Sequence, residues 1–406
     1  MRILHTGDWH IGQTLRGYAR DREHQAVLDD VVRVAAEREV DLLIVAGDVY
    51  DTQNPSGASQ RLFYETLVAL NRARPAMTTV IVAGNHDAPA RLEAPHPLLQ
   101  AFDVHVLGSV RRRDGVIDAG RHLVPVRVAG EVAAHVLAVS YPTAACLPTL
   151  EDEGEGSPVA RAVRSLYDEL WTGTRHQHGG VPVIATGHLH VAGGLESEGA
   201  ERRILVGGAH AVEHDVFPSE AAYVALGHLH RAQKVGRDTV RYCGSLIPLS
   251  ATEMGYRHTV TLVTLGGAGP AVEQVPVGRP VPFLRMPERG ETTVAELGDR
   301  LAALGLPRYL PLDQRPFIQV HVSREGLAPG FREEVDRIAE VFPVRVVDVR
   351  VPPLPDVVTD VARAIVTTRL ADIDPVKVFE AAFERKLGHA PEPRHRHVFD
   401  LLRSEG

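Results

Sequence analysis

Cysteine is scarce in this chain, with only two among 406 residues, Cys146 and Cys243. Two residues cannot supply a disulfide framework or a cysteine metal site, so we expect reduced, structural thiols. Long apolar runs are missing as well, since none approaches the roughly 18 residues of a membrane-spanning helix. The start, MRILHTGDWH, lacks the apolar core and cleavage site of a secretion signal. These absences predict a cytoplasmic protein without a membrane anchor.

Basic charge is also in short supply. Lys and Arg together number 44 against 52 Asp and Glu, which gives a formal net charge of −8. General adhesion to nucleic acid needs clustered positive charge, so any DNA binding must come from a local patch or a partner. The run RRR at 111–113 is a candidate patch, although a run this short is more often a solvated loop.

The first 250 residues alternate short apolar runs with helical patterns. Helices are predicted at 21–39 and 56–73, where apolar residues recur at helical spacing. The predicted strands lie at 2–8, 41–48, 79–87, 181–188, 222–230 and 239–245. This alternation is typical of layered proteins in which helices cover a sheet, so the predicted fold class is α/β.

Glycine and proline mark a boundary near residue 280, where GGAGP and PVGRPVP interrupt the pattern. We therefore predict a main domain at 1–280, a small α+β domain at 281–352 and C-terminal helices at 353–406. In the small domain, the expected elements are helices at 291–304 and 330–341 and strands at 317–322 and 344–350.

The C-terminal part is predicted to hold a linker at 351–356, helices at 357–370 and 375–388, and a short apolar segment at 398–402. The second helix carries an apolar stripe of Val376, Phe379, Ala382 and Phe383. Such a stripe packs either on its own domain or on a partner, and the sequence leaves both interpretations open.

Five of the apolar runs end in the same way, at a glycine followed directly by Asp, Asn or His. The junctions read TGD, AGD, AGN, TGH and LGH, and the last two open a repeated GHLH. Glycine lets the chain turn out of a sheet and present the next side chain at its rim. Because ligands of open α/β sheets collect at the carboxyl ends of the strands, we expect the five junctions to form one site.

The junction residues are of the types that bind divalent metals. They are Asp8, His10, Asp48, Asp51, Asn85, His86, Asp87, His188, His190, His228 and His230. Mixed imidazole and carboxylate ligands suit first-row divalent metals, whereas calcium and magnesium prefer oxygen alone. Two such metals, roughly 3.5–4 Å apart, form a clamp for in-line displacement at phosphorus.

A metal pair needs a bridging carboxylate, and Asp48 on the central strand is the natural bridge. Counting then gives each metal four protein ligands. The first metal is assigned Asp8, His10, Asp48 and His230, and the second Asp48, Asn85, His188 and His228. His190 is left over and is interpreted as a bystander.

His86 lies next to a predicted ligand but is not needed as one. Oriented by a carboxylate such as Asp51 or Asp87, it could donate a proton to the leaving oxygen or steady the charge on a phosphate. The alternative is that His86 merely caps the turn.

The order D-x-H, G-D-x-x-D, G-N-H-D, G-H, G-H-x-H resembles that of the calcineurin-like metallophosphoesterases. The resemblance implies a four-layer α/β/β/α sandwich with a two-metal site, usually active with manganese. Within that superfamily, MRILHTGDWHIGQTL, IVAGDVYDTQNPS, AGNHD, IATGHLH and ALGHLHRAQ are similar to segments of the bacterial SbcCD nuclease family. The resemblance runs from residue 1 to about 260, and more loosely to the C-terminus.

This resemblance implies roles for individual residues and parts of the chain. It assigns metal binding to Asp8, His10, Asp48, Asn85, His188, His228 and His230, and catalysis to His86. The small domain corresponds to a capping domain that helps select DNA. The C-terminal helices correspond to those that dock on the coiled-coil base of an SbcC-type ATPase.

The family also implies an activity and an assembly. The implied activity is an ATP-dependent 3′–5′ exonuclease on double-stranded DNA and an endonuclease on single strands and hairpins, used in DNA repair, recombination and replication. The implied assembly is a homodimer of this subunit within a heterotetramer. The chain has no G-x-x-x-x-G-K-[ST] pattern, so ATP hydrolysis is expected to belong to the partner.

Two alternatives remain open. A phosphatase or cyclic-nucleotide phosphodiesterase of the same superfamily would use the same metals, and the acidic net charge mildly favours it. A non-catalytic subunit with a structural metal site would have no use for His86.

Overall fold

The computed structural model describes residues 1–113, 115–148, 157–197, 211–267, 269–352, 375–387 and 390–404. The chain forms two compact units, Met1–Arg350 and Val351–Gly406. The larger unit contains the converging strand ends that the sequence predicts to form the site.

The first sheet of the larger unit has six strands in the order β16-β15-β1-β4-β5-β6. Their bounds are β16 Gly269–Pro276, β15 Thr259–Gly266, β1 Arg2–Thr6, β4 Leu42–Ala46, β5 Thr78–Val82 and β6 Val104–Leu107. Strands β1, β4, β5 and β6 run parallel, so their carboxyl ends meet at one edge. Strand β15 pairs with β1 in the antiparallel direction.

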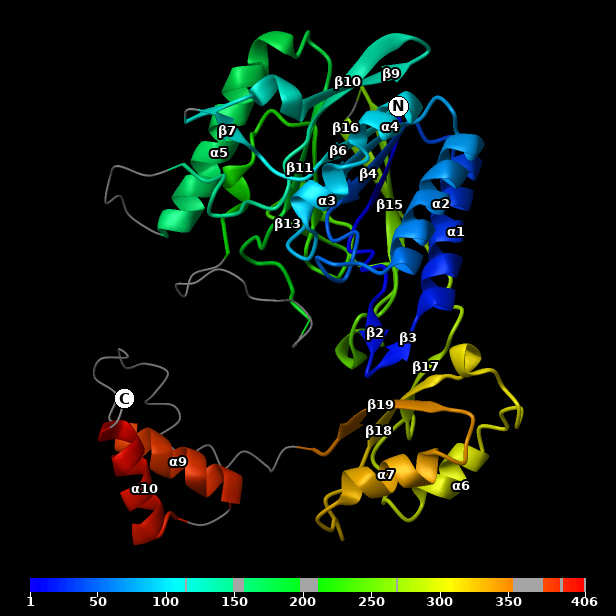
Figure 1. The fold of residues 1–406 in the computed structure, drawn as a ribbon, viewed down its shortest axis with the longest axis vertical. Coiled ribbons are helices and arrows are strands. Elements are labelled where there is room, and N and C mark those ends of the chain that lie inside the picture. The colour runs from blue at the N-terminus through cyan, green and yellow to red at the C-terminus, as the bar shows by residue number, and fades with distance from the viewer. Residues whose placement is uncertain are drawn as a thin grey trace. The chain divides into compact units, whose positions relative to one another are not determined.

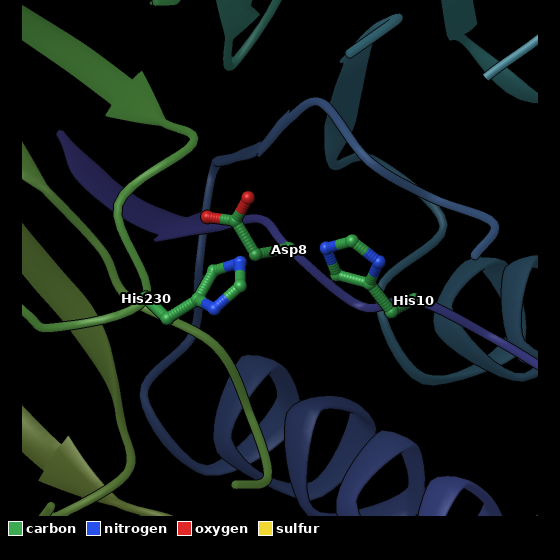
Figure 2. A group of neighbouring side chains, drawn as sticks. All are labelled: Asp8, His10 and His230. Atoms are coloured by element: carbon green, nitrogen blue, oxygen red, sulfur yellow. The ribbon is translucent and has the colours of Figure 1, made fainter. Parts of the chain in front are cut away.

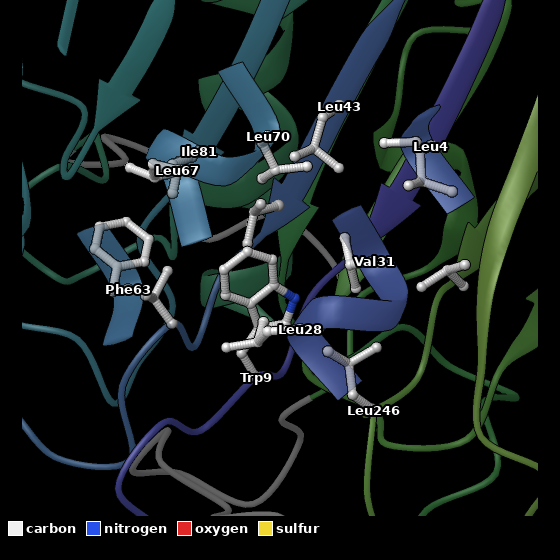
Figure 3. Close-up of a cluster of buried hydrophobic side chains, with 14 of the residues drawn as sticks. Leu4, Trp9, Leu28, Val31, Leu43, Phe63, Leu67, Leu70, Ile81 and Leu246 are labelled. Atoms are coloured by element: carbon white, nitrogen blue, oxygen red, sulfur yellow. The ribbon is translucent and has the colours of Figure 1, made fainter. Parts of the chain in front are cut away.

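Helices α1 (Asp21–Glu37) and α2 (Gly57–Ala73) cover one face of this sheet. Each buries apolar residues three or four positions apart, such as Val27, Val31 and Val34 in α1. Ser56 caps the N-terminus of helix α2, and its side chain accepts a hydrogen bond from the Ser59 amide. Figure 3 shows the resulting core, in which Trp9 lies among leucines of the helices and the sheet.

The second sheet also has six strands, in the order β13-β14-β12-β11-β10-β9. Their bounds are β13 Gln233–Val235, β14 Arg237–Tyr242, β12 Tyr223–Gly227, β11 Val183–His188, β10 Glu131–Leu137 and β9 Leu123–Val128. Helix α5 (Pro158–Thr174) packs on its outer face through buried residues such as Leu166 and Leu170.

The two sheets pack on each other through a third cluster of buried side chains. It includes Ile44 and Val80 of the first sheet and Ile184 and Ala225 of the second. With helices α1 and α2 on one outer face and α5 on the other (Figure 1), the layers are α/β/β/α. The predicted four-layer fold is confirmed.

Shorter elements connect these layers. They are β2 (Thr14–Leu15), β3 (Tyr18–Ala19), α3 (Pro89–Glu93), α4 (His96–Leu99), β7 (Arg112–Arg113) and β8 (Val116–Ile117). Two of the three arginines in the run at 111–113 form ion pairs, Arg111 with Glu93 and Arg112 with Glu169. This favours the structural interpretation of that run.

Residues 283–350 form a three-stranded parallel sheet with two helices. The elements are β17 (Phe283–Met286), α6 (Leu297–Ala302), β18 (Phe317–His321), α7 (Phe331–Ala339) and β19 (Arg345–Arg350). Strand β17 was not predicted, because a four-residue run between prolines has little local signal. The helix expected at 291–304 begins only at Leu297.

This small sheet packs against the hairpin formed by β2 and β3. Phe283 and Phe317 share a buried cluster with Leu15, and Tyr18 packs against it. Arg345 is fully buried there, with its guanidinium 3.7 Å from the centre of the Phe317 ring. The hairpin closely follows His10 in the chain, so the small domain contacts a segment close to the predicted site.

In the second unit, the described residues form helices α9 (Pro375–Leu387) and α10 (Pro393–Ser404). The helix predicted at 375–388 is present, and the apolar segment at 398–402 lies within α10. Phe379 of α9 stacks on Phe399 of α10 at a ring distance of 4.4 Å, so part of the apolar stripe packs within the unit. The helix predicted at 357–370 lies outside the described residues. Among the described helices, none has the length and apolar character needed to cross a membrane.

Candidate metal centre

The predicted site residues lie where strand ends of the two sheets meet. Asp8 follows β1, Asp48 follows β4, and Asn85 and His86 follow β5 of the first sheet. On the second sheet, His188 ends β11, while His228 and His230 follow β12. The five junctions therefore converge, as the sequence predicts, because the carboxyl ends of parallel strands share an edge.

Backbone conformation at this edge is unusual. Asp8, His10, Asp48 and His228 have φ values of 49°, 44°, 49° and 101°, in a region that side chains other than glycine rarely adopt. Two backbone hydrogen bonds hold the first loops together: the amide of Asp8 donates to Gly47, and that of His10 donates to Asp48, both at 3.0 Å. The surrounding structure thus compensates for the strain and fixes these side chains in place.

Trp9 lies between two site residues in the chain but packs into the core. Asp8 and His10 lie together in the site, while Trp9 between them packs into the helix-covered core (Figure 3). Trp9 is 1% exposed, and its indole N–H donates to Thr6.

One group of candidate ligands consists of Asp8, His10 and His230. One possible ligand atom of each lies within 4.8 Å of the others, and all three residues are buried. Figure 2 shows that they come from two segments far apart in the chain, the loop after β1 and the loop after β12. The group contains three of the four ligands predicted for the first metal, the fourth being Asp48.

Asp48 lies between this group and the remaining histidines. Its Oδ2 is 3.4 Å from His10 Nε2 and 3.3 Å from His188 Nε2. The Oδ1 atom of Asn85 lies 3.0 Å from His188 Nε2 and 3.1 Å from His228 Nδ1. The geometry is compatible with Asp48 as a bridge and with Asn85, His188 and His228 around a second ion.

The histidines are oriented by hydrogen bonds from the ring nitrogens that face away from the site. His188 Nδ1 donates to the carbonyl oxygen of Ala46 at 2.8 Å, which leaves Nε2 facing inward. His230 Nδ1 lies 2.8 Å from Glu253, and His10 Nδ1 lies 3.2 Å from Asp51. Partners of this kind fix the tautomer and ring direction of metal-binding histidines.

Glu253 is a supporting residue that no sequence motif indicated. It is fully buried, and its two oxygens contact His230 Nδ1 and accept from the Leu249 amide, each at 2.8 Å. It lies 23 positions beyond His230, outside every junction motif, so only folding brings the two together.

His86 lies beside His10 and Asp48, and one possible ligand atom of each of the three lies within 4.8 Å of the others. Its amide donates to Asp48 Oδ1 at 2.8 Å, and its Nδ1 donates to the backbone carbonyl of Asp51 at 2.7 Å. The orienting contact expected from a carboxylate is therefore made by the main chain of Asp51. Asp87 instead accepts from the amides of Gly84 and Tyr50, so it braces the loop itself. These bonds are compatible with both a catalytic and a turn-capping His86.

His190 lies apart from the candidate ligand groups. Its Nε2 is 3.3 Å from a carboxylate oxygen of Glu196, and its ring centre is 6.4 Å from that of His228. The interpretation of His190 as a bystander stays a prediction.

The electrostatics of the buried groups fit a site for cations. Burial raises the pKa of Asp8 to about 7, against the opposing influence of the nearby histidines. Burial alone would lower the pKa of His188, but the carboxylate of Asp48 raises it to about 9. The buried Nε2 of His10 has no hydrogen-bond partner among the described residues. An inward-facing imidazole nitrogen with no hydrogen-bond partner, beside buried carboxylates, is typical of a site that binds a divalent metal.

The chain matches two family models. Residues 1–232 match the calcineurin-like phosphoesterases, and residues 279–386 match a model described as the type 5 capsule protein repressor C-terminal domain. The first match covers more than half of the chain, so the protein is a calcineurin-like phosphoesterase, as its layers and its buried imidazole–carboxylate cluster indicate.

Curated relatives narrow this class. The SbcD chain of nuclease SbcCD from Rhodobacter capsulatus is 46% identical over 85% of this chain and 86% of the relative. The proteins of the same name from Escherichia coli K12 and Bacillus subtilis are 32% and 38% identical, over 86% and 65% of this chain and 85% and 66% of their own lengths. The chain belongs to the SbcD family of SbcCD nuclease subunits, which confirms the resemblance predicted from the motifs.

Proposed function

We propose that the protein is a metal-dependent nuclease subunit that hydrolyses phosphodiester bonds in DNA. One observation carries the proposal: candidate ligands from both sheets gather around Asp48, and His86 donates its amide to the same carboxylate, in a chain whose relatives are named nucleases. The proposed ligands are Asp8, His10, Asp48 and His230 on one ion and Asp48, Asn85, His188 and His228 on the other. When bound, two divalent ions would activate water and stabilise the departing oxygen. Mixed imidazole and carboxylate ligands suit first-row divalent metals, and manganese is proposed among them because the resemblance to the calcineurin-like metallophosphoesterases implies it.

His86 is the proposed catalytic residue. Its Nδ1–H is committed to the Asp51 carbonyl, so the ring donates toward a substrate oxygen only from a protonated Nε2. In that form, His86 would protonate the leaving oxygen or hold a non-bridging phosphate oxygen. Asp51 serves in this proposal as a positioning residue that orients both His86 and His10.

Manganese-dependent degradation of linear double-stranded DNA tests this function. We expect the purified chain, alone or with an SbcC-type ATPase and ATP, to degrade DNA. His86→Ala should reduce the rate by a factor of about 10² or more, the usual size of a general-acid contribution, while bound manganese stays unchanged. His190→Ala is the matched control and should retain activity.

The alternative function gives a different outcome. If only a small phosphodiester is cleaved even with the partner and ATP present, the protein is a phosphodiesterase and the nuclease proposal fails. If His86→Ala changes neither reaction, His86 caps the turn and the catalytic assignment is wrong.

We further propose a division of labour along the chain. Residues 1–280 form the nuclease domain, 281–352 a capping domain that helps to select DNA, and 353–406 the segment that docks on a coiled-coil ATPase of the SbcC type. The names of the relatives, each a subunit of SbcCD, support a partner subunit. The proposed assembly is a homodimer of this subunit within a heterotetramer. The proposed activities are an ATP-dependent 3′–5′ exonuclease on double-stranded DNA and an endonuclease on single strands and hairpins. The proposed role is in DNA repair, recombination and replication in the cytoplasm.

The docking segment can be tested at Val398, which is 54% exposed on α10. Replacing it with aspartate should weaken co-purification with the ATPase by a factor of about ten, because a charge would be buried at the interface. Val341→Asp, at a residue 80% exposed in the larger unit, is the control. Equal recovery of the partner with both variants would contradict docking through this face of α10.

A further inference from the structure

A cavity of 530 Å³ adjoins the metal centre on the side of His230. Its walls are His230–Ala232, Cys243–Ser245, Gly255–Arg257 and Thr259. His230 therefore borders the proposed metal site and this cavity at once. The volume falls in the range of roughly 300–1,000 Å³ that is typical of ligand sites.

The charge of the cavity walls is positive. Arg231 and Arg257 line it, and none of its lining residues is an aspartate or a glutamate. Neither arginine forms an ion pair with a carboxylate in the described part of the chain, unlike Arg111 and Arg112, which do. In a protein with a net charge of −8, these two guanidinium groups can bind an anionic ligand.

The wall that carries these arginines is fixed by further contacts. The guanidinium of Arg231 lies 5.7 Å from the ring centre of Tyr256, and the Tyr256 hydroxyl hydrogen-bonds to Ser197 at 3.2 Å. Arg279 donates to the carbonyl oxygens of Met254 and Tyr256 at 2.9 and 3.0 Å. Ordering the loop in advance lowers the entropy cost of holding a ligand there.

We infer that this cavity is a second phosphate site, in which Arg231 and Arg257 hold the backbone phosphate of a single DNA strand next to the one that is hydrolysed. Arginine suits this task because its planar fork binds two phosphate oxygens at once. The shared wall at His230 makes a neighbouring phosphate of the same strand the natural occupant. The inference rests on the proposed nuclease function and names how its substrate would be positioned.

Binding of a fluorescent single-stranded oligothymidylate to the full chain, in buffer with EDTA, tests this site. The Arg231→Gln, Arg257→Gln double variant should raise the Kd by about tenfold, which corresponds to the roughly 1.4 kcal/mol of one tenfold step. The slope of log K against log salt should become shallower by about 0.7, the value for one lost phosphate contact on a single strand. Arg127→Gln, an exposed arginine on β9, is the matched control and should leave both quantities unchanged.

Two further measurements separate the causes. Manganese binding by the double variant should match that of the wild type, which excludes an indirect effect through His230. An unchanged Kd and salt slope, or no measurable binding by the wild-type chain, overturns the second phosphate site. Manganese-dependent DNA cleavage by the wild type is scored separately, so the nuclease proposal can stand when this inference fails, and the reverse.

Discussion

His230 is braced from behind by Glu253, whose carboxylate is completely buried between the histidine and the Leu249 amide. A buried carboxylate opposite Nδ1 keeps the proton on that nitrogen and leaves Nε2 free to bind metal. The same logic applies to Ala46 behind His188 and Asp51 behind His10. At this scale, the residues behind the ligands decide the chemistry as much as the ligands themselves.

Replacing Glu253 with glutamine tests this support. The amide has no negative charge to balance the polarised imidazole, so manganese affinity should fall by a factor of about 10–100, the usual effect of losing such a partner. A manganese titration of the purified variant measures the change. Glu220→Gln, at an exposed residue, serves as the control. Wild-type affinity in the Glu253 variant would show that His230 needs no support from it.

At the scale of strands, the site depends on how closely β4 and β12 approach each other from different sheets. A side-chain carbon on Gly227, at the end of β12, would lie 1.9 Å from the carbonyl oxygen of Ala46 and 2.9 Å from His188 Nδ1. Glycine is required here because a backbone group occupies the space that a side chain would need. The hydrogen bond between His188 and Ala46 crosses the same gap between the sheets.

Gly227→Ala should therefore lower the free energy of unfolding by about 3 kcal/mol, at the upper end of overpacking effects, and disturb metal binding as well. Urea denaturation measures the first effect and a manganese titration the second. Gly57→Ala at the start of α2 is the comparison, since nothing lies within 4 Å of the added carbon. A stable Gly227→Ala protein with normal metal binding would refute the close-packing argument.

For the whole molecule, the apolar layer between the two sheets contains a buried histidine. His5 on β1 contacts the Tyr223 hydroxyl at 3.0 Å and the Leu226 carbonyl oxygen at 3.2 Å, both from the second sheet. Burial lowers the pKa of His5 to about 3. In the unfolded chain the pKa returns to 6.5, so below this value the unfolded state binds a proton that the folded state rejects.

The free energy of unfolding should therefore be unaffected by His5 above pH 6.5 and fall progressively from pH 6.5 toward pH 3. At pH 5, His5 alone should cost about 2 kcal/mol, from roughly 1.4 kcal/mol for each pH unit below 6.5. Urea unfolding of the wild type and His5→Gln at pH 7 and pH 5 checks this, with exposed His176→Gln as the control. If both substitutions leave the pH dependence of the free energy of unfolding as it is in the wild type, burial does not keep His5 unprotonated in the folded state.

Much of the site could be predicted because its signals are local. A glycine that lets the strand turn out of the sheet, followed by a metal-binding side chain, is a short-range pattern, and parallel strands bring such ends to one edge. The pattern indicated the seven proposed ligands and His86, and the structure brings these side chains together at the strand ends. It did not predict that Glu253 contacts His230 or that the Asp51 carbonyl accepts from His86. Residues that hydrogen-bond to a ligand can come from any loop that folding brings next to it.

By itself, the sequence determined the layered α/β class, the residues at the strand ends and the family resemblance, since periodicity and glycine junctions are encoded within a few residues. Only the tertiary structure decided how the two sheets face each other, which nitrogen of each histidine points inward, and that Arg231 and Arg257 line one cavity beside His230. These features depend on contacts between segments far apart in the chain. The physical reason is that close packing fixes such contacts together, and no local pattern records them.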